Sequence, residues 1–218
     1  MLTGLSNGYE DDTTPRSTSS FAVQVGDVVV VKAAIENGVE ADGNASLNIS
    51  YSGSGVIDSW NRRIETGSGS NASYATAWTA SVTTAGSITV TITKINGAAP
   101  FGYYFGAIAE VWRGSDGIGN VVTEADDGQP SEAISTTQSN SALSFWFGDW
   151  NAQSGTQTGT VSGGGSVTDE SSYPGDSTHY GVYNGYVADG GSTGSHTVGM
   201  SAPTSQQARG GVIEIKGQ

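Results

Sequence analysis

The chain contains no cysteine and only two histidines, and both shortages limit the kinds of catalytic and metal-binding site that it can form. Without thiols it has no disulfide framework, no thiolate nucleophile and no cysteine-based zinc site. A domain of this length buries roughly 70% of the surface of its unfolded chain, so it needs no crosslink or metal to fold. His179 and His196 are isolated from one another in the sequence, and each is expected to be a hydrogen-bonding group at the surface near a loop. The sequence therefore predicts neither a cofactor nor a resident metal.

Basic residues are also scarce, with 8 Lys and Arg against 21 Asp and Glu and a net charge of −13. Such a surface repels phosphate backbones, which excludes nucleic acid as a partner. No stretch approaches the ~20 apolar residues that cross a bilayer, so no membrane insertion is expected. The first twenty residues lack a basic segment followed by an apolar one, so they do not predict a secretory signal. If the protein functions outside the cell, something other than a signal peptide must take it there, and release by lysis inside an assembled particle is one such route.

Helical patterns are missing as well, whereas short β-prone runs alternate with clusters of Gly, Asn, Ser and Asp. Ile88, Val90 and Ile92 alternate with threonines, which places the aliphatic side chains on one face of a strand. A parallel sheet would need crossover helices, so the pattern favours antiparallel sheets. The predicted strands cover residues 21–25, 28–35, 46–52, 56–65, 73–82, 87–95, 103–113, 142–151, 157–162, 179–187, 195–201 and 210–216.

This spacing predicts an all-β protein, a jelly-roll-type sandwich of about ten or eleven antiparallel strands. Residues 21–218 are expected to form one domain, and no repeat of fixed period is visible in the sequence. Residues 1–20 are polar and are expected to form a flexible arm that docks onto a larger assembly. The candidate docking residues are Asp11, Asp12, Thr13, Thr14, Pro15 and Arg16.

Aromatic residues offer the first candidate site. All five tryptophans fall on predicted strands, where they can either pack in a core or present flat rings to a sugar. Trp78, in an alternating Ala and Thr context, is assigned to the core. The candidate glycan contacts are Trp146, Trp150, Tyr180, Tyr183 and Tyr186. The three tyrosines are spaced by three, so they share a strand face only if a bulge occurs near Gly181 or Gly185.

Carboxylates offer the second candidate site. Glu110 lies on a predicted strand as the nucleophile of a jelly-roll glycosidase would, but hydrolysis needs a second carboxylate about 5–10 Å away. Glu65, Asp149 and Glu214 are the possible partners; the alternative is a carboxylate that faces solvent or pairs with Arg113. Residues 124–128 and Asp176 could supply oxygens to calcium, but they lack the full loop pattern, and an acidic turn is the simpler interpretation.

Six segments together carry a resemblance. They are FAVQVGDVVVV (21–31), AWTASV (77–82), GSITVTI (86–92), EVWRGSDGIG (110–119), SNSAL (139–143) and GVIEIKG (211–217). Their succession resembles β-sandwich virion proteins of tailed viruses of high-GC hosts, of the minor tail or decoration type. The resemblance implies a capsid decoration or turret, a tail part or a receptor-binding module, with other virion proteins as partners and no catalytic residues. It also implies a homo-oligomer, for which a trimer is the hypothesis by analogy.

Three functions remain open at this point. The first is a non-enzymatic structural virion protein. The second is a carbohydrate-binding module, either free or as the adhesive function of the same virion protein, which binds a host-surface glycan. The third is a glycoside hydrolase that uses Glu110.

Overall fold

The structure is a computed structural model of the 218-residue chain. It describes residues 2–8, 16–35, 47–66, 74–94, 105–124, 128–149, 151, 153–173 and 181–217. All regular structure in these residues is β-strand, and the paired strands are antiparallel, which confirms the all-β prediction. Because the described ranges contain no helix, they contain none that could span a bilayer.

The chain divides into two compact units, Met1–Ser115 and Asp116–Gln218. Each unit has its own two sheets and its own hydrophobic cluster. The single domain expected over residues 21–218 therefore contains two such units, and whether they behave as one domain stays a prediction.

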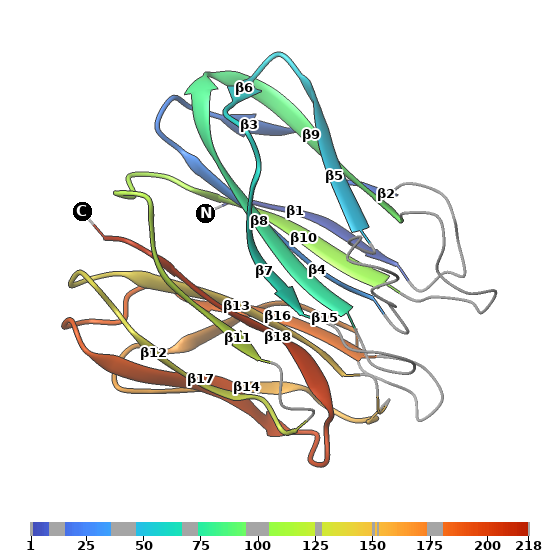
Figure 1. The fold of residues 1–218 in the computed structure, drawn as a ribbon, viewed down its shortest axis with the longest axis vertical. Coiled ribbons are helices and arrows are strands. Elements are labelled where there is room, and N and C mark those ends of the chain that lie inside the picture. Colours follow the sequence, from blue (N-terminus) through green and yellow to red (C-terminus); the bar gives the residue numbers. More distant parts are fainter. Residues whose placement is uncertain are drawn as a thin grey trace. The chain divides into compact units, whose positions relative to one another are not determined.

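The first unit contains ten strands in two sheets, coloured blue to green in Figure 1. The larger sheet has the order β1-β10-β4-β8, with β6 and β7 both paired to β8; the other has β2 and β3 beside β9, and β9 beside β5. The strands are β1 (Leu2–Gly8), β2 (Arg16–Ser17), β3 (Phe21–Val23), β4 (Val28–Ile35), β5 (Leu47–Gly53), β6 (Val56–Ile57), β7 (Asn61–Thr66), β8 (Tyr74–Thr84), β9 (Gly86–Lys94) and β10 (Phe105–Trp112).

Both sheets of the first unit contribute side chains to one core. Val29 and Val31 of β4 lie in the same cluster as Ile88 and Val90 of β9. The alternation of β9 predicted that its aliphatic residues share one face of the strand, and these residues are buried in the core. Ile49, Tyr51 and Trp60 are half-buried against the same core.

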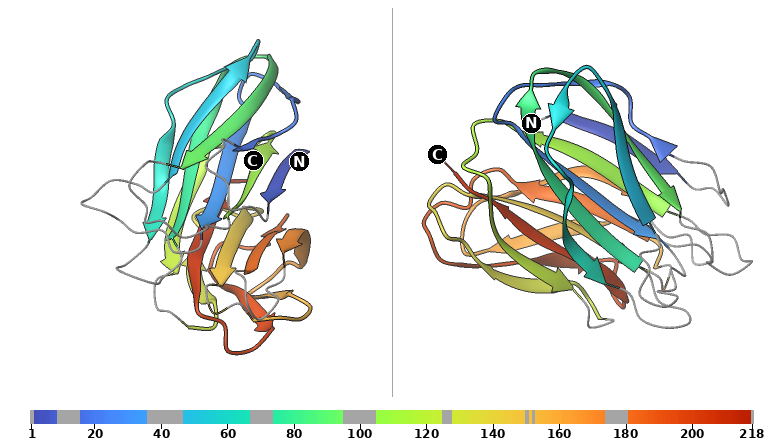
Figure 2. Two further views of the ribbon diagram at one scale, coloured as in Figure 1. Left: turned by 90° about the vertical axis from the view of Figure 1, so that its right-hand side faces the viewer. Right: turned by 45° about the horizontal axis from the view of Figure 1, so that its top comes forward.

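The second unit contains eight strands, yellow-green to red in Figure 1, and the views in Figure 2 allow the strands of each unit to be followed from other sides. Its sheets have the orders β11-β18-β13-β16-β15 and β12-β17-β14. The strands are β11 (Ile118–Glu124), β12 (Ser131–Ser135), β13 (Ala142–Asp149), β14 (Thr158–Ser162), β15 (Val167–Tyr173), β16 (Gly181–Val187), β17 (Ser195–Ala202) and β18 (Ala208–Ile215). Phe145 and Val212 from the first sheet and Val198 from the second share its core.

The two units repeat one strand order. In the second unit the eight strands, numbered along the chain, form the sheets 1-8-3-6-5 and 2-7-4. The first unit has the same order when β2 and β3 count as one interrupted second strand and the two-residue β6 is set aside. The third and last strands also pair in the same register, because β4 and β10 match end to end over eight residues, as do β13 and β18.

Two irregularities recur at equivalent positions. The register of β7 on β8 shifts between Arg62 and Ile64, and that of β15 on β16 shifts between Asp169 and Ser171. A residue in the left-handed region precedes each third strand by two positions: Gly26 has φ 88° and Asn140 has φ 56°. Because bulges and left-handed turns are specific local features, their recurrence indicates two copies of one topology.

The sequence predicted most of the longer strands but fewer strands than the eighteen in the described residues. It missed β11, β12 and β15, whose Gly, Asn, Glu and Ser content masks their alternation. It also assigned residues 1–20 to a flexible arm, whereas β1 pairs with β10 along its whole length and β2 pairs with β9. Of the predicted docking residues, Asp11, Asp12, Thr13, Thr14 and Pro15 lie outside the described residues, and Arg16 pairs with Ile92.

Candidate functional site

The predicted glycan contacts do not form one exposed surface. Trp146 on β13 and Tyr183 on β16 are fully buried, so neither presents a ring face to a sugar. Tyr183 donates a hydrogen bond to Asp169. The pKa of its phenol is raised above the usual value, mainly because the phenol is buried and also because of this hydrogen bond. Tyr186 is half-buried, and Trp150 and Tyr180 lie outside the described residues.

Glu110 is buried and paired with a lysine. Its carboxylate forms a salt bridge with Lys32 Nζ, and both side chains have no exposed surface. The indole N–H of Trp112 donates to Glu110 Oε2 at 2.7 Å. Within the described residues, the Glu110 carboxylate is therefore held by one ammonium group and one indole donor.

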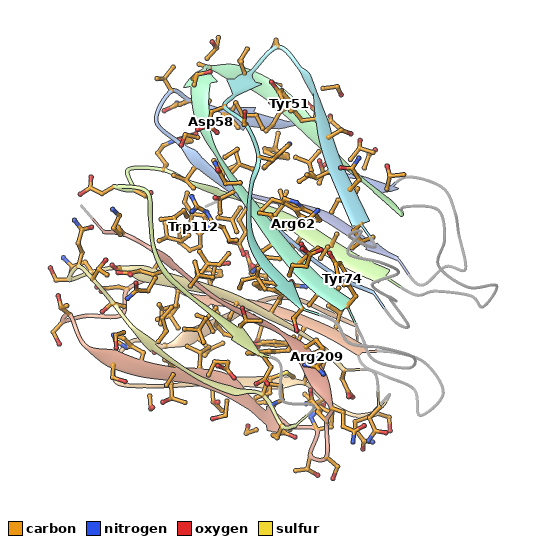
Figure 3. The ribbon with its side chains drawn as sticks, viewed as in Figure 1. Tyr51, Asp58, Arg62, Tyr74, Trp112 and Arg209 are labelled. Atoms are coloured by element: carbon orange, nitrogen blue, oxygen red, sulfur yellow. The ribbon has the colours of Figure 1, made fainter. Side chains whose placement is uncertain are left out.

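Glu65, the first candidate partner of Glu110, belongs to a different cluster. Arg62 Nη1 donates to both of its oxygens at 2.9 Å, and the Tyr74 hydroxyl donates to Oε1 at 2.6 Å. The Arg62 guanidinium also lies 5.8 Å from the centre of the Trp78 ring. Burial, and then the hydrogen bond to Glu65, raise the pKa of Tyr74 above its usual value. Figure 3 labels Arg62 and Tyr74 in this cluster.

Asp149, the second candidate, organises a turn. Its carboxylate accepts backbone N–H groups of Asn151 at 3.0 Å, Gln153 at 2.8 Å and Gln207 at 2.9 Å. Burial raises the pKa of Asp149, and these hydrogen bonds oppose the rise only in part.

Glu214, the third candidate, fastens the segment between β12 and β13. It accepts the backbone N–H of Thr137 at 2.6 Å and that of Asn120 at 2.8 Å, and the Ser141 hydroxyl donates to it at 2.8 Å. Burial raises the pKa of Glu214, but these hydrogen bonds together outweigh it and leave the pKa below its ordinary value. Each of the three candidates is therefore engaged in a structural hydrogen-bond network.

Arg113 pairs with an aspartate and not with Glu110. Its Nε and Nη2 donate to the two oxygens of Asp27 at 3.1 and 3.0 Å. The hydrogen bond to Asp27 raises the pKa of the guanidinium. This fork joins the end of β10 to the turn before β4. Arg62 and Arg63 are consecutive in the sequence and bind different groups: Arg62 Nη1 donates to Glu65, and Arg63 Nε donates to Thr79 at 2.8 Å.

The candidate metal ligands and histidines are only partly described by the structure. Glu124 is buried and accepts the Ser131 N–H at 3.3 Å, while Asp126, Asp127, Asp176 and His179 lie outside the described residues. Among described side chains, no group of three or more His, Cys, Asp and Glu is placed to hold a metal. His196 was expected near the surface, but it is 1% exposed, because its position on β17 points it inward with Val198 and Met200.

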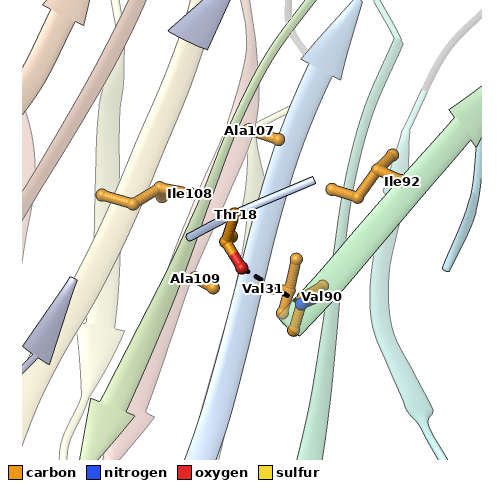
Figure 4. A pocket seen from close by; sticks show the side chains of 7 residues that line it. All are labelled: Thr18, Val31, Val90, Ile92, Ala107, Ile108 and Ala109. Carbon is orange, nitrogen blue, oxygen red and sulfur yellow. Dashed lines mark hydrogen bonds between the residues drawn. The ribbon is translucent and has the colours of Figure 1, made fainter. Parts of the chain in front are cut away.

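A small apolar cavity lies in the first unit (Figure 4). Its volume is about 10 Å³, which is roughly the room that one water molecule needs. The one hydrogen bond drawn there joins the Val90 N–H to the Thr18 hydroxyl at 3.1 Å. The lining residues are Thr18, Val31, Val90, Ile92, Ala107, Ile108 and Ala109. A cavity of this volume is too small for an organic ligand.

Sequence reasoning missed one aromatic pair. Tyr51 of β5 and Trp60, just before β7, are both half-buried, with ring centres 6.4 Å apart and planes at 80°. Trp60 Nε1 has no hydrogen-bond partner in the described structure. Leu47, Ile49 and Tyr51 alternate with polar residues along β5 and are its less exposed positions, but no local pattern indicates that Trp60 lies beside Tyr51.

These features define a class: an all-β protein of antiparallel sheets whose described buried carboxylates serve structural networks. In comparisons with known proteins, no family model, no curated protein and no solved structure matches the chain.

Proposed function

We propose that this chain is a non-enzymatic structural protein of a tailed-virus particle, acting in assembly, stabilisation or adhesion to the host surface. The observation that supports the non-enzymatic part is that Glu110 and its three candidate partners are each bound by other groups of the protein. Glu110 is paired with Lys32, Glu65 with Arg62 and Tyr74, and Asp149 and Glu214 with backbone donors. The particle context rests on the resemblance carried by six segments of the sequence.

The finer fold proposal is that each unit is a jelly-roll sandwich. The first strand lies beside the last and the second beside the seventh in both units, an order compatible with paired Greek keys across two sheets. A structural module built from the same rigid topology twice suits a particle component, which must present fixed surfaces to neighbouring subunits. The proposed partners are other capsid or tail proteins and further copies of this chain, with a trimer as the first oligomer to test.

The test is immunogold labelling of purified particles from the source with antibody raised to the recombinant chain. Gold over the head supports a decoration or turret, and gold at the tail supports a tail part or receptor-binding module. Particles without gold, in a preparation where a known particle protein is labelled, would overturn the virion proposal.

Carbohydrate binding is the second candidate function. The half-buried Tyr51 and Trp60 favour it, because aromatic rings at a surface stack on the apolar faces of sugars. This function is compatible with a virion adhesin and also with a free binding module.

A further inference from the structure

We propose that Tyr51 and Trp60 form a contact site for a neutral glycan on the first unit. The inference deepens the adhesive part of the proposed function, and it remains testable if the chain proves not to be a particle component. The second unit repeats the strand order of the first, so equivalent positions of the two units can be compared.

The equivalent of Tyr51 in the second unit is Val161. Gly53 and Gly163 are matching positions: a Cβ on Gly53 would collide with the Ser87 carbonyl, and one on Gly163 with the Ser195 carbonyl. Tyr51 and Val161 each lie two residues before their glycine. Both are half-buried against the core of their own unit.

The equivalent of Trp60 is Val167. The matching bulges begin after Arg62 and after Asp169, and Trp60 and Val167 each lie two residues before that point. Val167 is also half-buried against its own core. Two valines therefore cover in the second unit the position that a tyrosine and a tryptophan cover in the first.

Covering the core does not require the aromatic pair. Valine has no polar group to satisfy, whereas Trp60 leaves its indole N–H without a partner in the described structure, which is unfavourable for a group with almost no solvent contact. Both residues are only half-buried, and the 80° angle between their ring planes makes a corner rather than a stacked pair. This corner can receive the apolar face of a sugar ring on one wall and its edge on the other.

Two charged residues flank Trp60 in the sequence, Asp58 and Arg62, and both carry groups that can bind sugar hydroxyls. Asp58 is exposed, and its Oδ1 accepts the Ser81 N–H at 2.8 Å, which fixes the orientation of the carboxylate. Arg62 is held by Glu65, and its side chain is 36% exposed. Figure 3 labels Tyr51, Asp58 and Arg62 on the first unit. Because the chain has a net charge of −13, an anionic polysaccharide would be repelled, and a neutral one is the expected ligand.

The experiment uses the full chain and an array of neutral glucose-, galactose- and mannose-based polysaccharides, followed by titration calorimetry on the polysaccharides that bind. The central variant is Tyr51→Val with Trp60→Val, which gives the first unit the pair that the second already has. Val161→Ala with Val167→Ala is the matched control. We expect the central variant to weaken binding about tenfold or more, and the control to bind like the wild type.

Trp60→Phe keeps a ring over the core and replaces the double valine variant in the experiment if that variant does not fold. We expect Trp60→Phe to weaken binding about threefold. Far-UV circular dichroism establishes the fold of each variant. An array on which the wild type binds no neutral polysaccharide overturns the inference, as does undiminished binding by a folded Tyr51 and Trp60 variant. Neither result affects the immunogold test of the particle proposal.

Discussion

Gly53 and Gly163 occupy the same position in the two units, and in each case the backbone of a neighbouring strand excludes a side chain. The Cα atom of Ile88 lies 3.0 Å from a Cβ built on Gly53, and that of His196 lies 3.1 Å from one built on Gly163. Both glycines have positive φ, 130° and 90°. The shared constraint is a property of the topology, because the two nearest atoms at both sites belong to the backbone, and Ile88 and His196 have different side chains.

Replacing either glycine by alanine should therefore destabilise the protein. Gly53→Ala and Gly163→Ala each combine a left-handed backbone with a collision against backbone atoms, and each should lower the free energy of unfolding by about 3 kcal/mol. Urea denaturation provides the measurement. Gly117→Ala is the control, since Gly117 has φ 98° but open space around a Cβ, so its effect should be about 1 kcal/mol. Equal effects at all three sites would show that the collision is relieved at no cost.

Glu214→Gln should loosen the segment that Glu214 fastens. The charged carboxylate accepts two short backbone hydrogen bonds and one from Ser141, so its neutral replacement should lower the free energy of unfolding by about 2 kcal/mol at pH 7. The folded pKa of Glu214 is lowered, so its stabilisation is fully present above the unfolded pKa of about 4.3 and is lost as the pH falls through the folded value. The difference between wild type and variant should shrink in urea titrations below that pH; a constant difference would contradict the assignment.

The buried Lys32 and Glu110 pair should be strongly coupled. Lys32→Met or Glu110→Gln alone leaves one buried charge without its partner and should destabilise by about 3 to 5 kcal/mol. The double variant removes both charges and keeps an acceptor for the Trp112 indole N–H, so it should be more stable than either single variant. A double-mutant cycle in urea measures the coupling. Additive losses would show that the two groups do not depend on each other.

Tyr74→Phe should reveal the bond between Tyr74 and Glu65. At neutral pH the loss of this hydrogen bond should lower the free energy of unfolding by about 1 kcal/mol. The folded pKa of Tyr74 is raised, so its contribution is fully present below the unfolded pKa of about 10 and is lost as the pH rises through the folded value. Wild type and Tyr74→Phe should therefore converge in stability at alkaline pH. Divergence there would mean that the phenol ionises more readily in the folded state.

The all-β class could be predicted because alternation is a local property. The strand predicted over residues 28–35 is β4 itself, and the alternating run that contains Ile88, Val90 and Ile92 is β9. Strands such as β12 escaped prediction because the side chains of its sequence SEAIS include only one buried apolar residue. A single inward residue gives no detectable period.

The repeat escaped prediction for a different reason. Equivalent positions share location but not chemistry: Lys32 is the fifth residue of β4, and Trp146 is the fifth residue of β13. Tyr51 and Val161 differ in the same way. A search for similar letters at a fixed spacing cannot find such pairs, whereas the strand order and the matching bulges show them directly.

The candidate site was the least predictable part. The sequence marked Glu110, but its partner Lys32 was read only as part of a strand, and the salt bridge depends on the pairing of β4 with β10. The hydrogen-bond partner of Tyr183, Asp169, is likewise on a strand that the sequence did not predict. Contacts between strands arise from pairing partners far apart in the chain, and a single sequence does not specify these partners.

In each unit the first strand pairs with the last, Leu2 opposite Val111 in one and Ile118 opposite Ile215 in the other. A module whose entry and exit lie on neighbouring strands behaves as a cassette: its gene segment can be joined to another without threading the chain through an existing fold. The same geometry makes each unit a candidate for circular permutation and a practical scaffold for the display of inserted peptides.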